Sequence, residues 1–154
     1  MSSHGNLGYG TTSTLYGAAH RASYYSNNPN PSLVCQNKND KFTEDTKNGN
    51  GKLTYPVGLI TLDETVLAGF NTYYSNKSDY KDTTNYLYTN SIYWTSSPVA
   101  LYVRATVGYV SSAGYVNYNS VSLAYGIRPV VSLISGTLVN SNGDGTTTNP
   151  YVVQ

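Results

Sequence analysis

Apolar and polar residues alternate through much of the second half of the chain, and this pattern predicts β-strands. The turn at Ser111–Gly114 joins two of these strands at hairpin spacing. Pro129 places another strand at a sheet edge, or marks the residue at which that strand begins. The expected strands span residues 92–95, 101–110, 115–119, 127–134 and 151–153.

A helix is expected at residues 62–68. Thr61 and Glu64 have the spacing of a capping box, in which each side chain bonds the backbone N–H of the other residue. Gly69 is suited to the left-handed position that follows a helix. Leu62 and Val66, with Leu67 as a further candidate, are expected to face the core. A weaker apolar stripe predicts a second short helix within residues 15–25.

The rest of the chain is rich in turn residues. Residues 1–14 are expected to be a loosely held lead-in, and residues 15–154 to form one domain. Residues 53–60 are interpreted as a buried extended run after the turn signals at Asn48–Gly51. The polar, Tyr-rich segment 71–90 is typical of a functional loop, because structureless segments of that length are uncommon in compact domains.

Charge is scarce and balanced: 11% of residues are charged and the net charge is +1. No basic stripe is visible, so binding to nucleic acid through phosphates is not expected. No run of 18 apolar residues occurs, and direct membrane insertion is not expected. An extracellular or cell-surface location would require a signal or anchor upstream of this sequence.

The sequence predicts a non-enzymatic protein without a cofactor, since histidines and cysteines are few and scattered. His4 and His20 have no neighbouring carboxylate or cysteine that would suggest a catalytic dyad. Cys35 is the one cysteine, which excludes cysteine-rich metal sites and an internal disulfide. It is interpreted as a reactive thiol, as half of a disulfide with an absent partner, or as a small buried hydrophobe.

The carboxylates suggest no metal site either. Asp63 and Glu64 are adjacent on the predicted helix, where anions favour its N-terminal turn. Asp79 and Asp82 lie among lysines and are interpreted as a solvated charge cluster. Residues 142–145 lack the alternating oxygen ligands of a calcium loop.

Tyrosine is the positive signal, with 17 Tyr against 2 Phe. A buried tyrosine hydroxyl needs a hydrogen-bond partner, so a chain that only filled a core would use more phenylalanine. Tyr with Ser, Asn and Gly is the chemistry of antibody paratopes, and aromatic rings with amides also suit sugar rings. The alternative is that tyrosine merely fills strands.

Five blocks of sequence, in order, resemble the C-terminal domains of many surface-predicted proteins of gut Firmicutes. The blocks are Asn48–Ile60, Thr61–Gly69, Tyr93–Pro98, Tyr125–Leu133 and Asn149–Val153. Those domains in turn resemble the C-type lectin fold, as used by formylglycine-generating enzymes and by the variable proteins of diversity-generating retroelements. In that fold a Trp-containing strand precedes a variable stretch and a Gly-aliphatic-Arg ending.

The resemblance implies an α+β, C-type lectin-like fold with a small antiparallel or mixed sheet, one or two short helices and long ordered loops. Trp94, Gly126 and Arg128 are expected to be structural. Trp94 is interpreted as a core anchor in preference to a ligand platform, and Arg128 as a residue that ties loop carbonyls or a carboxylate together in preference to a ligand contact. Enzymatic activity does not carry over, because the formylglycine-generating enzymes use a pair of cysteines. Calcium-mediated sugar binding does not carry over either, because Asn28–Asn30 is not a sufficient motif.

The expected function is a binding or display module for a protein or glycan ligand on a cell surface. Its contact surface should lie between Trp94 and Arg128, and strand alternation should turn about half of the candidates outward. If the chain is a retroelement-diversified protein, changes should concentrate at Asn, Tyr and Ser codons between Leu101 and Asn119. The alternatives are a pilin-like or spacer domain without a discrete ligand and, third, an enzyme. The candidate contact residues are Tyr102, Arg104, Tyr109, Tyr115, Asn117, Tyr118, Asn119 and Tyr125.

Overall fold

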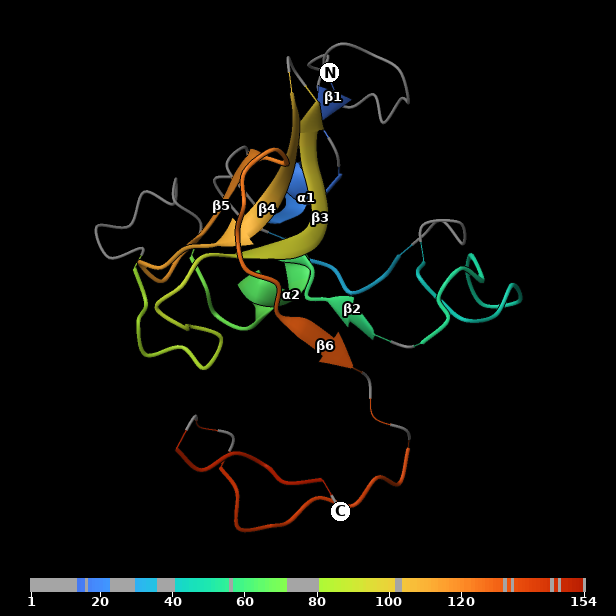
Figure 1. Cartoon of the computed structure of the whole chain (residues 1–154), viewed down its shortest axis with the longest axis vertical. Helices are drawn as coiled ribbons and strands as arrows, with labels where there is room; N and C mark the ends of the chain where they lie inside the picture. Colours follow the sequence, from blue (N-terminus) through green and yellow to red (C-terminus); the bar gives the residue numbers. More distant parts are fainter. Residues whose placement is uncertain are drawn as a thin grey trace.

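A computed structural model of the chain describes residues 14–15, 17–22, 30–35, 41–55, 57–71, 81–101, 104–131, 133, 135–144, 146 and 148–153. These residues form an α+β arrangement of two antiparallel sheets and two short helices (Figure 1). The elements in chain order are β1 (Thr14–Leu15), α1 (Gly17–Ala22), β2 (Val57–Leu59), α2 (Leu62–Leu67), β3 (Tyr93–Leu101), β4 (Ala105–Val110), β5 (Val116–Ser120) and β6 (Pro129–Val131).

The larger sheet has the strand order β1-β3-β4-β5. Strands β4 and β5 form the predicted hairpin, with Tyr109 opposite Asn117. Strand β3 is longer than expected, because it continues past residue 95 to Leu101 and shifts its register against β4 near Pro98. The strand expected at 101–110 is therefore two elements, the end of β3 and all of β4. Thr14 pairs with Leu101, so the residue expected to end the lead-in is part of this sheet.

The smaller sheet pairs β2 with β6, and β6 begins at Pro129 as one of the two interpretations of that proline predicted. The extended run expected at 53–60 is only partly a strand, and the prediction that it is buried is wrong. Tyr55 and Val57 are exposed, and Ile60 is the buried one among the residues of this run that the structure describes. The Ile60 carbonyl accepts a hydrogen bond from the Ser96 N–H, which attaches this sheet to β3.

The start of α2 confirms the predicted capping box. The Thr61 hydroxyl accepts from the Glu64 N–H at 3.1 Å, and the Glu64 carboxylate accepts from the Thr61 N–H at 2.7 Å. Gly69 has φ +99° after the helix, as predicted. Leu62 is fully buried and Val66 packs against the core, but Leu67 is exposed, so the prediction for Leu67 is wrong.

Helix α1 lies within the range expected for the first helix, and an ion pair joins it to α2. Arg21 donates from Nε and Nη2 to the two carboxylate oxygens of Asp63, at 2.8 and 2.9 Å. The Ser32 N–H also donates to Asp63, at 2.9 Å. Asp63 was expected only to favour the helix start; in the structure its buried carboxylate joins three segments distant in sequence.

The hydrophobic core lies between the two helices and one face of the larger sheet, which we call the inner face. Gly108 lies on this face, because a Cβ atom there would meet the Leu62 side chain at 3.1 Å. Close packing of this layer supplies most of the burial that stabilises the fold. The buried core residues are Ala18, Ala22, Ile60, Leu62, Phe70, Leu87, Tyr93, Val99, Ala100, Val110 and Val116.

The segment 81–90 docks on the tip of the β4–β5 hairpin. The Asp82 N–H donates to the Gly114 carbonyl at 2.6 Å. The Asp82 carboxylate accepts from Thr84 and from the Asn85 N–H, and these bonds lower the pKa of Asp82. Of the expected functional loop 71–90, residues 72–80 lie outside the described part of the chain, as does Asp79.

Beyond β6 the chain runs away from both sheets (Figure 1). The strand expected at 151–153 forms only a bridge between Val153 and Val139. Residues 1–13, which include His4, lie outside the described residues, as do Ser132 and Ile134 of the strand expected at 127–134. No helix among the described residues is long and apolar enough to cross a membrane.

Candidate functional site

Three aromatic rings pack together on the outer face of the larger sheet, opposite the helices. Trp94 and Tyr109 are cross-strand partners on β3 and β4, and their ring centroids lie 6.3 Å apart, edge to face. Tyr125 lies against both rings, at 4.5 Å from Trp94 and 5.3 Å from Tyr109. Tyr109 is buried, whereas Trp94 and Tyr125 are half-buried. We call these three residues the aromatic cluster, in which Trp94 and Tyr125 offer the ring surface.

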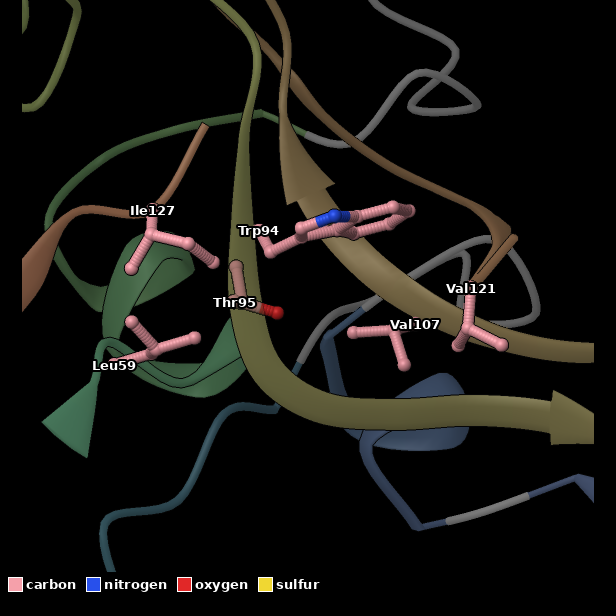
Figure 2. A pocket seen from close by; sticks show the side chains of 6 residues that line it. All are labelled: Leu59, Trp94, Thr95, Val107, Val121 and Ile127. Atoms are coloured by element: carbon pink, nitrogen blue, oxygen red, sulfur yellow. The ribbon is translucent and has the colours of Figure 1, made fainter. Parts of the chain in front are cut away.

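An open apolar depression of about 280 Å³ lies beside the aromatic cluster (Figure 2). Figure 2 shows Ile127 and Leu59 on one side of β3, and the indole of Trp94 with Val107 and Val121 on the other. Ile127 and Val121 are more than half exposed. The lining contains no ionisable group, and such concave apolar surfaces are typical of ligand sites. The lining residues are Leu59, Trp94, Thr95, Val107, Val121 and Ile127.

Polar groups border the same face. Asn117 and Asn119 stand opposite Tyr109 and Val107 in the hairpin, so all four share the outer face. The Asn119 amide donates to the Tyr125 hydroxyl at 3.0 Å. The site therefore combines aromatic and aliphatic surface with two amides and a hydroxyl.

Strand alternation separates the other predicted contact residues. Tyr118 packs against the core on the inner face, away from the aromatic cluster. Arg104 is exposed, and Tyr115 is half-buried where the hairpin turns. Tyr102 lies outside the described residues. The structure therefore brings Tyr109, Asn117, Asn119 and Tyr125 together with Trp94, and it leaves Arg104 and Tyr118 elsewhere.

Trp94 was expected to be a core anchor, and the structure places it outside the buried core. Side chains alternate between the two faces of β3, and Tyr93 and Thr95, the neighbours of Trp94, are the ones that point inward and are buried. Four lining residues of the depression were not among the predicted contact residues: Leu59, Val107, Val121 and Ile127. Ile127 alone had a signal, since it lies within the Gly-Ile-Arg ending beside Arg128.

Arg128 joins a loop to the sheet, as the structural interpretation of this residue expected. Its Nη1 donates to the Leu87 carbonyl at 2.8 Å, and its guanidinium lies 5.6 Å from the Tyr93 ring centroid. The Tyr93 hydroxyl donates to the same carbonyl at 2.7 Å. Burial raises the pKa of Tyr93, and the nearby Arg128 opposes that rise.

Gly126 attaches the segment 125–128 to β3 through its own backbone groups. Its carbonyl accepts from the Trp94 N–H and its N–H donates to the Ile92 carbonyl, both at 3.0 Å. A Cβ atom on Gly126 would lie 3.0 Å from the Ile92 carbonyl oxygen. This short parallel bridge places Tyr125 and Ile127 on either side of it, next to Trp94.

Replacing Arg128 with alanine is expected to lower the free energy of unfolding by about 2 kcal/mol, because a bond from a charged donor and a cation–π contact are lost. Tyr93→Phe removes only a neutral hydrogen bond and should cost about 1 kcal/mol, because the Leu87 carbonyl still accepts the hydrogen bond from Arg128. Urea unfolding of both variants measures the two losses in the free energy of unfolding. An Arg128→Ala protein as stable as the wild type would contradict the structural role.

No metal centre emerges from the parts of the chain that the structure describes. No three His, Cys, Asp or Glu side chains gather there. Asp144 accepts from the Thr146 N–H within its own turn, and hydrogen bonds from Thr146 lower its pKa. Cys35 is half-buried, and the side chain of His20 is not described. The outer face remains the candidate site.

Comparisons of this chain with protein-family models, with curated proteins and with solved structures found no match.

Proposed function

We propose that this chain is a non-enzymatic binding module of the cell surface or extracellular space, and that its outer face contacts a protein or glycan ligand. The observation that carries the proposal is the aromatic cluster beside the open apolar depression. Exposed aromatic and aliphatic surface flanked by amides provides large contact area with few rotors to immobilise. The depression would hold one apolar group of the ligand, and the polar groups beside the aromatic cluster would face its polar edge.

The proposed fold family is C-type lectin-like, on the basis of the sequence blocks given above. The arrangement around β3 supports this, because Trp94 and the Gly126–Arg128 segment are neighbours joined by backbone hydrogen bonds. In the proposed scheme the stretch between them carries the variable contact residues.

A near-copy of the codons for Leu101–Asn119 elsewhere in the genome, with adenines where the two differ, would support retroelement diversification. Absence of that copy would remove this part of the proposal.

Tryptophan fluorescence can test the binding site directly, because Trp94 is the one tryptophan of the chain and lies in the site. Ligands first identified on glycan and host-protein arrays should shift Trp94 emission on titration. Ile127→Ala should weaken binding about 10-fold, as expected for an apolar anchor of an interface.

Val131→Ala is the matched control for Ile127→Ala. Val131 is 61% exposed and Ile127 is 62% exposed, but Val131 lies on β6 and does not line the depression. The control should bind like the wild type, with circular dichroism confirming that both variants fold. Equal affinities for Ile127→Ala and Val131→Ala would place the binding surface elsewhere and refute the proposed site.

A further inference from the structure

The hydrogen bonds of Asn119 fix which way its amide points. Its Oδ1 accepts from the Ser120 N–H at 2.8 Å, so its Nδ2 is the group that faces the Tyr125 hydroxyl. Amide nitrogen can only donate, and the Tyr125 oxygen must therefore accept. The hydroxyl hydrogen of Tyr125 is then left for another acceptor, and no described side chain or carbonyl takes it.

We infer that Tyr125 is the hydrogen-bond donor of the outer-face site, and that Asn119 is the positioning residue that fixes its polarity. The inference rests on the proposed function and adds to it the chemistry of the ligand. That ligand must present a hydrogen-bond acceptor beside an apolar group that fills the depression. Asn119, which was expected to contact the ligand, acts through Tyr125.

The chemistry of the depression favours a protein ligand. Leu59, Val107, Val121 and Ile127 line it with aliphatic carbon, which suits a branched apolar side chain. A peptide presents a carbonyl acceptor next to every side chain, within reach of a neighbouring donor. A sugar would bring hydroxyls against these four aliphatic residues, where they would lose their partners. The ligand class is therefore an apolar residue of a protein with its backbone carbonyl.

Asn119→Asp tests the polarity with a change of one atom. The carboxylate still accepts from Ser120 but can no longer donate, so the Tyr125 hydroxyl should turn and donate to it. Asn117→Asp is the matched control, because Asn117 shares the outer face and accepts from the Tyr118 N–H at 2.8 Å in the same way. In the free protein, the ¹³Cζ resonance of Tyr125 should move in Asn119→Asp and stay in place in Asn117→Asp. An unmoved Tyr125 resonance in Asn119→Asp overturns the positioning role without any ligand.

The binding arm uses N-acetyl-leucine methylamide and methyl β-D-glucopyranoside as probes, followed through Trp94 emission. For the wild type, the half-saturation concentration of the leucine probe should be lower than that of the glucoside. Tyr125→Phe and Asn119→Asp should each raise that concentration about 3- to 10-fold, the effect of one hydrogen bond. The double variant should be no weaker than either single variant, because both changes remove the same donor.

The outcomes separate this inference from the proposed function. A leucine probe that binds Tyr125→Phe as well as the wild type overturns the donor role, while the binding site stands. A glucoside that binds more tightly than the leucine probe overturns the protein ligand class. Failure of both probes and of every array ligand to shift Trp94 emission overturns the inference and the proposed function together.

Discussion

Replacing Arg21 with methionine is expected to lower the free energy of unfolding by about 3 kcal/mol, a large share of the stability of a domain this size. The variant keeps an unbranched apolar stem but removes both charged donors to Asp63. The Asp63 side chain is 4% exposed, so its carboxylate would stay buried and keep the hydrogen bond from the Ser32 N–H without a compensating charge. Chemical denaturation followed by circular dichroism measures the loss.

Asp63→Asn in the Arg21→Met background should recover about 1 kcal/mol or more. The amide removes the buried charge and keeps an oxygen for the Ser32 N–H, so the double variant no longer buries an unpaired carboxylate. The coupling energy of the cycle isolates the ion pair from the packing of the two side chains. Two single variants whose losses simply add would show that the pair contributes no stability of its own.

Replacing Gly114 with alanine is expected to cost about 3 kcal/mol or more. Gly114 has φ +79°, a region that costs a residue with a side chain about 1–2 kcal/mol. A Cβ atom there would also clash with the Asp82 carbonyl oxygen. The new methyl group must therefore displace the backbone of segment 81–90 from the hairpin tip, and the hydrogen bond from the Asp82 N–H is lost with it.

Two other glycines separate the contributions to this loss. Gly136 has φ +86°, and a Cβ atom there would meet nothing within 4 Å, so Gly136→Ala should cost only the conformational part, about 1–2 kcal/mol. Gly58 has ordinary φ and open space, so Gly58→Ala should be close to neutral. Thermal or urea unfolding of the three variants gives the comparison. If Gly114→Ala lost no more stability than Gly136→Ala, the contact with Asp82 would be refuted.

Features that depend on a few neighbouring residues were predictable. The capping box of α2, the glycine after it, the β4–β5 hairpin and the start of β6 at Pro129 all follow from short-range hydrogen bonding and backbone sterics. Segment ends were predicted less well. Strand β3 runs on past Thr95, where it pairs with β4 and, at its end, with β1, which comes from a distant part of the chain.

The candidate site was predictable in outline only. The stretch between Trp94 and Arg128 does contain the aromatic cluster, but alternation alone could not say which tyrosines point outward. Tyr118 and Tyr109 both lie in predicted strands. Tyr118 packs against the core on the inner face, whereas Tyr109 packs against Trp94 on the outer face. That choice depends on which face of the sheet the helices cover, and a shift of one residue would reverse it.

The sequence by itself determined the local elements of this protein and the scarcity of ionisable groups, since both depend on residues close in the chain or on composition. Tertiary structure alone decided three juxtapositions: Arg21 with Asp63 in an ion pair, Ile127 with Trp94 in the lining of one depression, and Asn119 with Tyr125 in a hydrogen bond. The first two join residues 42 and 33 positions apart, and the third closes across the turn after β5. Such contacts form when packing of the core fixes the faces of helices and strands, because no short-range pattern specifies them.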